Sequence, residues 1–370
     1  MSYVNGKYIS VDVNMINAWN MALLMWKIGD MNIEGRVVLG PMSGITSSCY
    51  RDFMKPFGVA VSVTEMTSDR GIIHGHERSM AYVRFKQNYP TGLQLFGNDP
   101  DILARAAKIA ALNNSNIDFF DINMGCPVSK IVNNGSGSAL MEDPRKCGDI
   151  VRRIKEVVDI PVTAKIRLGS DKNINFRLVI DELTDAGADV IVVHARTKEE
   201  LYTGIPHFEL VEDLQSEMSV PLIISGNIYS LDDAVRAVDI TGASAVMVAR
   251  GAVGNPYLIS QIDSYYRTGE ILSNPTVSQQ VHWCLSLADA MIQEKGEVSA
   301  MNVLRGIAPK FIAGCHECRE YRHRLAVETV DLEGLARLLH EIESKMGDKQ
   351  IRTEGIGNRQ GDPVISSTEG

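Results

Sequence analysis

The stretch from residue 162 to residue 193 holds one complete unit of a pattern that recurs along this chain. It begins with Val162-Thr163-Ala164-Lys165-Ile166, continues as a helical pattern over residues 176–186, and closes with the apolar run 190–193. Short β-branched runs with few polar interruptions are typical of strands that are covered on both faces. The stretch therefore predicts a parallel strand–helix–strand unit, in which the helix crosses over one face of the sheet.

Eight such runs occur over roughly 220 residues, separated by helical stretches. Several of these stretches follow a residue that can cap a helix, such as Asp99, Asp143 and Ser230. The spacing predicts an α/β fold of the (β/α)8 TIM barrel class. A doubly wound open sheet is the alternative, but no Gly-x-Gly-x-x-Gly follows the first run. The eight runs are 37–39, 59–63, 93–96, 119–122, 162–166, 190–193, 222–224 and 245–248.

The repeating pattern does not cover the whole chain. Residues 1–32 form an N-terminal extension, which we expect to be helical because Ala22–Trp26 is a short run suited to an amphipathic helix. We expect the barrel over residues 33–260. An appended C-terminal helical domain is predicted over residues 261–346, where helical patterns continue without strand-like runs. Residues 347–370 are polar and glycine-rich, which predicts a disordered tail.

Composition restricts the class of protein. The chain has 370 residues, of which 45% are hydrophobic and 22% charged, the usual mix of a globular protein. Six cysteines are too few for a disulfide scaffold and favour a reducing compartment. Because no run resembles a signal peptide or reaches transmembrane length, we expect a cytoplasmic protein without membrane contact, and nothing points to an obligate protein partner. With a net charge of −9, binding to a nucleic acid would require a local basic face.

The residues that end the predicted strands are the informative ones, because active sites of such barrels lie at the C-terminal ends of the strands. Polar groups occur at most of these ends, and Lys165 stands out among apolar neighbours. It could also be a surface lysine that extends outward. The last two strands lead into Ser225-Gly226-Asn227 and Ala249-Arg250-Gly251, the usual position of a phosphate site. Ordinary turn glycines are the alternative for these two segments.

A cysteine follows the fourth predicted strand, in Asp121-Ile122-Asn123-Met124-Gly125-Cys126-Pro127. Glycine and proline on either side of Cys126 exclude a helix there and favour a loop at the barrel mouth. A thiol at that position can act as a nucleophile or as a proton donor if nearby cations adjust its pKa. A buried cysteine that only fills space is the alternative.

The motifs taken together resemble those of the tRNA-dihydrouridine synthase family, and within it the bacterial B-type branch. The resemblance covers residues 33–325. It is carried by Asn-Met-Gly-Cys-Pro at 123–127 in combination with Lys-Ile-Arg at 165–167 and His-Ala-Arg-Thr at 194–197. Further matching segments are Pro41 to Thr46, Gln94 to Gly97, Gly137 to Met141 and Ala249 to Gly251.

This resemblance implies an enzyme that uses FMN, with NADPH as the reductant, to reduce a uridine of RNA, and of tRNA first of all, to 5,6-dihydrouridine. Hydride would pass from flavin N5 to uracil C6, and Cys126 would give a proton to C5. The uridine would have to leave its stack to reach the site. The implied flavin-binding residues are Pro41, Met42, Ser43, Gln94, Lys165, His194, Ser225, Gly226, Asn227, Ala249 and Arg250, and the implied substrate-binding residues are Asn123, Lys130, Arg167 and Arg196.

The predicted helical domain contains a basic cluster that could contact RNA together with the barrel mouth. A solvated helix face is the alternative for this cluster. Cys315-His316-Glu317-Cys318 offers too few ligands for zinc, so we expect no metal. The cluster consists of Arg305, Lys310, Arg319, Arg322, His323 and Arg324.

Two other functions remain open from the sequence. One is an FMN barrel oxidoreductase that acts on a free pyrimidine, similar to a dihydroorotate dehydrogenase, and it would not need a basic helical domain. The other is a non-catalytic RNA-binding relative that has lost its flavin. Ser225-Gly226-Asn227 favours this second alternative, because the family usually has Asn-Gly-Asp after the seventh strand.

Overall fold

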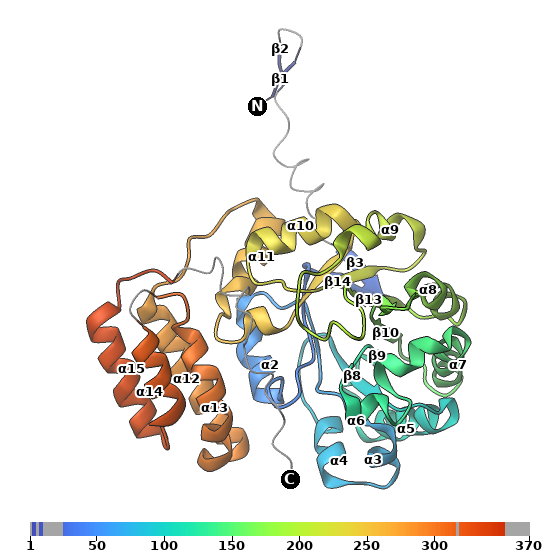
Figure 1. The fold of residues 1–370 in the computed structure, drawn as a ribbon, viewed down its shortest axis with the longest axis horizontal. Helices are drawn as coiled ribbons and strands as arrows, with labels where there is room; N and C mark the ends of the chain where they lie inside the picture. The colour runs from blue at the N-terminus through green and yellow to red at the C-terminus, as the bar shows by residue number, and fades with distance from the viewer. Residues whose placement is uncertain (1, 5–6, 10–24, 316–317, 352–370) are drawn as a thin grey trace.

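A computed structural model of the chain describes residues 2–4, 7–9, 25–315 and 318–351 (Figure 1). A closed parallel barrel forms its centre. The strands are β5 (Val37–Leu39), β6 (Val61–Val63), β8 (Thr91–Phe96), β9 (Phe119–Met124), β10 (Val162–Ile166), β13 (Val190–His194), β14 (Leu222–Ser225) and β15 (Ala245–Val248). Each pairs in parallel with its neighbours, and the β15–β5 and β6–β8 pairings close the ring. All eight predicted runs are strands, so the barrel prediction is confirmed.

Helices surround the barrel, and three of the predicted caps are present. Asp99, Asp143 and Ser230 accept hydrogen bonds from backbone N–H groups at the starts of α5, α7 and α10. The helices around the barrel are α2 (Ser48–Met54), α3 (Asp69–Ile73), α4 (Glu77–Val83), α5 (Pro100–Asn113), α7 (Pro144–Lys155), α8 (Phe176–Asp185), α9 (Leu214–Glu217), α10 (Leu231–Thr241) and α11 (Tyr257–Thr268).

Shorter elements occur in the connections. They are β7 (Thr67–Ser68), which pairs with β8, β11 (Gly169–Ser170), β12 (Asn173–Ile174), α6 (Ser129–Val132), and the 3-10 turns η1 (Lys55–Phe57), η2 (Gly137–Glu142), η3 (Phe208–Val211) and η4 (Arg250–Ala252).

The N-terminal extension differs from the expected helix. Residues 25 and 26, the described part of the run 22–26, belong to strand β3 (Met25–Ile28), which pairs antiparallel with β4 (Met31–Glu34). Gly29 has φ +58° and opens the two-residue turn between them. Along β3 the exposed and buried side chains alternate, the period of a strand rather than of a helix. Two further strands, β1 (Ser2–Val4) and β2 (Lys7–Ile9), form a separate hairpin.

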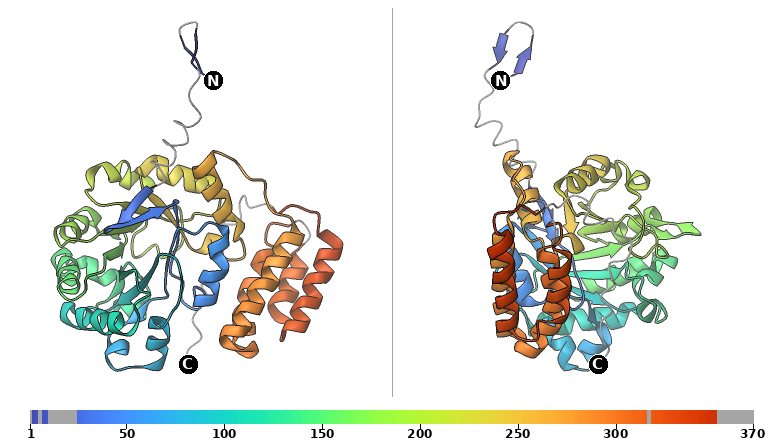
Figure 2. Two further views of the ribbon diagram at one scale, coloured as in Figure 1. Left: turned by 180° about the vertical axis from the view of Figure 1, so that it is seen from behind. Right: turned by 60° about the vertical axis from the view of Figure 1, so that its left-hand side comes forward.

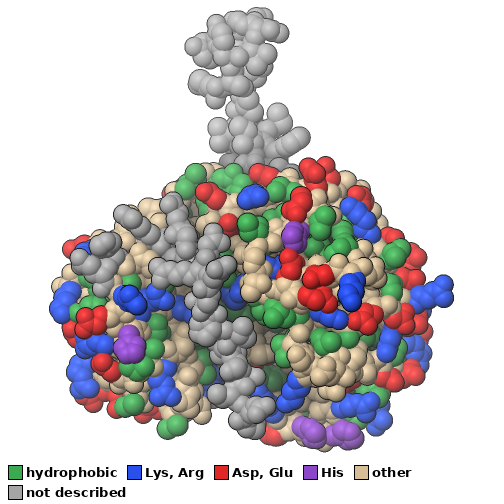
Figure 3. All heavy atoms as spheres, viewed as in Figure 1, with side chains coloured by type: hydrophobic (Ala, Val, Ile, Leu, Met, Phe, Trp, Pro, Cys, Tyr) green, Lys and Arg blue, Asp and Glu red, His purple; other side chains and the backbone are tan. Residues whose placement is uncertain are grey.

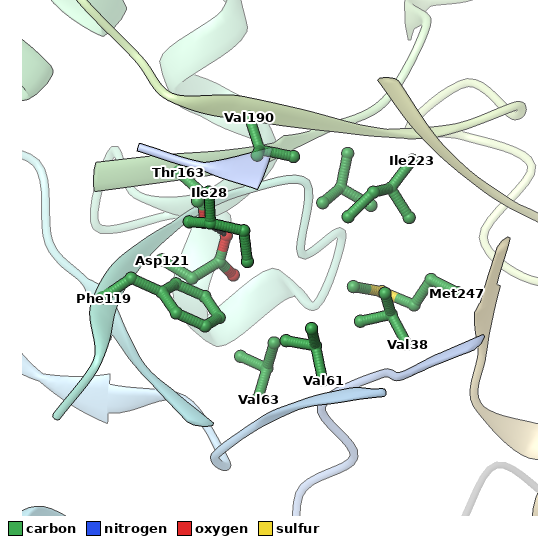
Figure 4. Close-up of a pocket in the computed structure, with 11 residues that line it drawn as sticks. Ile28, Val38, Val61, Val63, Phe119, Asp121, Thr163, Val190, Ile223 and Met247 are labelled. Carbon is green, nitrogen blue, oxygen red and sulfur yellow. Dashed lines mark hydrogen bonds between the residues drawn. The ribbon is translucent and has the colours of Figure 1, made fainter. Parts of the chain in front are cut away.

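The β3–β4 hairpin closes one end of the barrel (Figure 2, left). Trp26, Ile28 and Ile33 are buried there against the first residues of the barrel strands, including Phe119 and Val190. A small void of about 10 Å³ is lined by Ile28 and other apolar side chains, with Asp121 and Thr163 as its polar walls. Figure 4 shows these side chains around it. Because this end is closed by apolar side chains, the open end of the barrel is the one where the strands terminate.

Four helices form a separate bundle, which lies beside the barrel in Figure 1. They are α12 (Val277–Lys295), α13 (Glu297–Phe311), α14 (Arg319–Val327) and α15 (Leu332–Met346), and α12 packs against α2. The boundary predicted between residues 260 and 261 falls inside α11, whose apolar face packs on the barrel, so the bundle begins only at α12.

The predicted disordered tail is wrong for its first residues. Ile351 is buried, and its backbone N–H donates to Pro275 O over 2.8 Å, so the chain is fixed to the bundle up to residue 351. Residues 352–370 lie outside the described part. Within that part, no helix has both the length and the apolar character required to cross a membrane.

Candidate active site at the barrel mouth

Three polar side chains lie side by side on neighbouring strands inside the barrel. Gln94 on β8 and Thr163 on β10 are both register partners of Asp121 on β9. The Asp121 carboxylate accepts from Gln94 Nε2 over 2.7 Å and from Thr163 Oγ1 over 2.6 Å. Burial raises the pKa of Asp121, and these two hydrogen bonds and the Lys165 charge offset part of that rise.

Asn123 connects this group to the cysteine loop. Its Nδ2 donates to Gln94 Oε1 over 2.9 Å, and its Oδ1 accepts from the backbone N–H groups of Cys126 (2.9 Å) and Gly125 (3.3 Å). Both ends of the Asn123 amide are therefore bonded within the protein, and the first turn of the loop after β9 is fixed by a side chain of the strand itself.

The Cys126 loop sits close to its neighbours. Ser138 N–H donates to Cys126 O over 3.0 Å. Gly137 has φ +61°, and a Cβ there would lie 2.6 Å from Cys126 O, so only glycine permits this approach. The thiol is half-buried. Burial raises its pKa, which Arg167 and Lys165 lower in part, so the group is a protonated thiol at neutral pH.

Lys165 on β10 is the register partner of Asn123. Burial, followed by the nearby Arg167 charge, lowers its pKa to about 8. Within the described part of the chain its ammonium has no hydrogen-bond or ion-pair partner. Lys165 is thus not the outward-pointing surface lysine of the alternative interpretation. A half-buried cation that has no partner among the described residues is suited to an anionic ligand.

His194 ends β13 and lies near three arginines. Burial and the charges of Arg167, Lys165, Arg196 and Arg250 lower its pKa well below the usual value, so the ring is neutral. Its Nε2 is 3.2 Å from Arg196 Nη1. A guanidinium has only donors, so Nε2 accepts, the ring proton is on Nδ1, and Nδ1 is available to donate to a ligand.

Arg167 and Arg196 do not extend into the mouth. Arg167 is 1% exposed and donates to the carbonyl oxygens of Gly125, Thr197 and Leu201 over 2.7–2.8 Å. Arg196 is 0% exposed and donates to the carbonyls of Thr203 and Gly204. Their guanidinium groups therefore hold the loops at 125 and 197–204 in place. The RNA contacts expected for the two arginines stay a prediction.

The two turns after β14 and β15, which are predicted to form a phosphate site, contact each other. Arg250 Nη2 donates to Asn227 Oδ1 over 3.1 Å, and Asn227 adopts a left-handed φ of +48°. A Cβ on Gly251 would lie 1.9 Å from Ile228 O, so glycine is required there by close packing of the two turns. The Ser225 hydroxyl has no partner in the described part of the chain.

The loop after β5 is held from β6 and α4. Gly44 N–H donates to Glu65 Oε2 over 2.7 Å, and Tyr82 OH donates to the same oxygen over 3.0 Å. Thr46 accepts from Met42 N–H. These contacts fix the loop that contains Pro41, Met42 and Ser43. The loop lies next to the turn after β15, because β5 pairs with β15.

Sequence reasoning missed Tyr202. Its ring lies between two cations, with the guanidinium of Arg250 at 4.9 Å and that of Arg167 at 5.2 Å from its centroid, and it is 37% exposed. The sequence offered one signal for Tyr202: it is an aromatic residue in the loop that follows the strand ending in His194. Lys130, by contrast, lies where a substrate contact is possible, exposed on α6 just after the cysteine loop.

Only part of the predicted basic cluster of the bundle is available for contact with RNA. Arg324 is paired with Glu328 and Glu341, whereas Arg319 and His323 are exposed on the same helix. Figure 3 shows basic and acidic side chains intermixed on the bundle. The Cys318 thiol donates to Ile312 O, and His316 and Glu317 lie outside the described residues.

Comparisons with known proteins agree on one family. The model of a family described as dihydrouridine synthase matches residues 38–345. A probable tRNA-dihydrouridine synthase of Rickettsia conorii is 33% identical over 301 residues, covering 80% of this chain and 90% of the relative. A tRNA-dihydrouridine synthase B of Pseudomonas aeruginosa is 31% identical over 298 residues, covering 80% and 89%.

A solved structure supports the fold alone. Histamine dehydrogenase from Rhizobium sp. 4-9 superposes with a TM-score of 0.50 at 15% identity, over 73% of this chain and 51% of that one. The chain thus spans about half the length of that enzyme, and the likeness extends to the barrel architecture.

Proposed function

We propose a function that proceeds from one fact: this chain belongs to the dihydrouridine synthase family. It reduces uridine in tRNA to 5,6-dihydrouridine in the cytoplasm, with FMN as cofactor and NADPH as reductant. The observation that carries the proposal is the Cys126 thiol, protonated and half-buried at the end of β9, with the charges of Lys165 and Arg167 close enough to affect its pKa. The names of the relatives support the choice of tRNA as the substrate.

The donors at the mouth fit FMN. Ser225, the Nδ1 of His194 and the Arg250 guanidinium, on the turns and strand ends of β13–β15, would hold its phosphate. Lys165 has no protein partner in the described region and would neutralise the electron-rich edge of the ring system. Pro41, Met42, Ser43, Gln94, Gly226, Asn227 and Ala249 complete the proposed cofactor site.

The chemistry divides between cofactor and protein. FMN, when bound, supplies the hydride that is added at C6 of the uracil. Cys126 gives its proton to C5, which completes saturation of the C5–C6 bond and leaves a thiolate that solvent reprotonates. The raised pKa keeps this proton on sulfur until the carbon accepts it. The positive charges of Lys165 and Arg167 stabilise the thiolate that remains.

The remaining polar residues would position the substrate. We assign Asn123 to contact with the uracil, since the second Nδ2 proton, beyond the one given to Gln94, has only the weak thioether acceptor Met66 Sδ at 3.9 Å. We assign Lys130 to an RNA phosphate. Arg167 and Arg196 become positioning residues, because their donors are bonded to loop carbonyls. The exposed cations of the bundle would contact the tRNA outside the mouth.

The proposal is tested by mapping dihydrouridine across total RNA from cells with and without this gene. We expect loss of dihydrouridine at one or more tRNA positions, restored by the wild-type chain but not by Cys126→Ala. Purified Cys126→Ala should still be yellow with bound flavin. A colourless wild-type protein would favour the non-catalytic relative. A yellow protein that leaves all RNA unchanged would favour a free pyrimidine as substrate.

A further inference from the structure

We propose that Asp121 is a positioning residue for Cys126, because it fixes the direction of a hydrogen-bond chain that runs through Gln94 and Asn123 to the cysteine loop. The inference rests on the proposed function only for the role of Cys126. The hydrogen-bond chain itself is a property of this fold. It connects the side chains of Asp121, Gln94 and Asn123, on β8 and β9, to the backbone of residue 126.

The two ends of the chain allow only one orientation of the amides between them. Both Asp121 oxygens accept, one from Gln94 and the other from Thr163, so Gln94 directs Nε2 towards Asp121 and Oε1 towards Asn123. Asn123 must then direct Nδ2 towards Gln94 and Oδ1 towards the loop. At the far end of the hydrogen-bond chain, the backbone N–H of Cys126 can only donate. In this orientation it faces Asn123 Oδ1, which accepts from it.

Replacing the two acceptor oxygens of Asp121 by an amide removes this constraint. In Asp121→Asn the new amide can present its own N–H groups to Gln94, which would then turn its oxygen towards residue 121. Asn123 would follow, and its Nδ2 would face the N–H of Cys126, two donors against each other. The loop would have to move, or Cys126 and Gly125 would lose their acceptor.

The position of Asp121 also argues against a purely structural role. The carboxylate is 1% exposed at the centre of the barrel, where apolar side chains line most of the interior (Figure 4). A buried carboxylate costs folding free energy compared with a well-packed apolar residue. Both of its oxygens accept hydrogen bonds, one from Gln94 and the other from Thr163. Thr163 is not part of the hydrogen-bond chain that leads to Cys126. Thr163 therefore provides a matched control.

The first experiment separates the two half-reactions of the full-length, flavin-loaded enzyme. For Asp121→Asn we expect reoxidation of the flavin by tRNA to slow about 10- to 100-fold more than its reduction by NADPH, the loss typical of a misplaced catalytic group. Thr163→Val should slow reoxidation much less. In a Cys126→Ala background, Asp121→Asn should cause no further loss, whereas an equal, additive loss there would overturn the proposal.

The second experiment needs neither flavin nor RNA. Iodoacetamide labelling of the folded, flavin-free protein is followed at Cys126 by peptide mass spectrometry as a function of pH. Asp121→Asn should change the labelling rate at Cys126 but not at Cys49, the other half-buried thiol. Gln94→Met interrupts the chain at its middle and should have the same effect, which keeps the test valid if Asp121→Asn does not fold.

The outcomes distinguish the two proposals. Unchanged labelling of Cys126 in both variants would overturn the role of Asp121, whatever the substrate. Changed labelling in an enzyme that reduces no tRNA would leave the positioning role supported and the proposed function contradicted.

Discussion

Glu294, near the end of α12 in the bundle, accepts two hydrogen bonds from Cys49 on the barrel helix α2. The backbone N–H and the thiol each donate over 3.0 Å. Because Ser47 is the N-cap of α2, the N–H of Cys49 belongs to the first turn, whose donors have no partner within the helix. The bundle thus supplies a carboxylate that caps a barrel helix, directly after the loop proposed to line the flavin.

We predict that Glu294→Ala lowers the free energy of unfolding by about 0.5–2 kcal/mol, the range for losing a helix N-terminal cap, since the N–H of Cys49 loses its acceptor. Although burial opposes it, the hydrogen bonds from Cys49 lower the pKa of Glu294. The wild-type protein therefore has its full extra free energy of unfolding over Glu294→Ala at pH values above the ordinary glutamate pKa. This difference disappears as the pH falls through the lower pKa of the folded state. Urea unfolding at several pH values measures this, with the exposed Glu320→Ala as control. A difference in free energy of unfolding that persists at the lowest pH would contradict this prediction.

Lys165→Met should make the flavin-free protein more stable at pH 7, by about 1 kcal/mol or more, because a withdrawn charge is replaced by an apolar side chain. The folded-state pKa of about 8 lies below the ordinary lysine value. The unfolded wild-type chain therefore binds more protons between these values, and wild-type stability rises with pH across that window. The variant should show no such rise and should bind FMN more weakly. Lys130→Met, at an exposed site, should change neither property.

Arg167→Met should cost about 3 kcal/mol of stability, because three carbonyl oxygens lose their donors, in two buried hydrogen bonds and one part-buried hydrogen bond. Arg167→Lys should recover less than half of this loss, since one ammonium cannot reproduce the planar fork. Thermal unfolding provides the measurement, and Arg177→Met, whose side chain is 47% exposed, provides the control. Full recovery by lysine would show that charge alone matters at this position.

Arg319→Ala should weaken tRNA binding and reduce the slope of log K against log salt concentration by about 1, if the exposed cations of α14 contact phosphates. Lys108→Ala removes the same charge from the barrel helix α5 and should leave the slope unchanged. Filter binding of tRNA over a range of salt concentrations tests both. Equal effects of the two variants would mean that only net charge matters and that the bundle makes no specific contact.

The barrel could be predicted from the sequence because buried parallel strands leave a local pattern of short β-branched runs. The short run at 22–26 could not be assigned in this way, since it fits a strand as well as a helix. Residues 25 and 26 form a strand because their side chains can alternate between solvent and the closed end of the barrel. Nothing in the run itself indicates that a barrel end will be there to cover it.

The site was predictable to the level of the strand ends and no further. Arg167 directly follows β10 and Arg196 lies two residues after β13, but the loop carbonyls to which their guanidinium groups donate could not be predicted. In the sequence, Asp121 is only an acidic residue within an apolar strand. Its connection to Cys126 could not be predicted, because it passes through Gln94, which lies 27 residues away from Asp121 in the sequence.

The sequence by itself determined the order of the strands and the residues that end each one, because strand periodicity and turn chemistry depend only on neighbours along the chain. Only the tertiary structure decided which polar groups are left available to a ligand, such as Lys165 and His194, and which are bonded within the protein. That division depends on hydrogen bonds between segments far apart in the sequence, and these exist only once the barrel has closed.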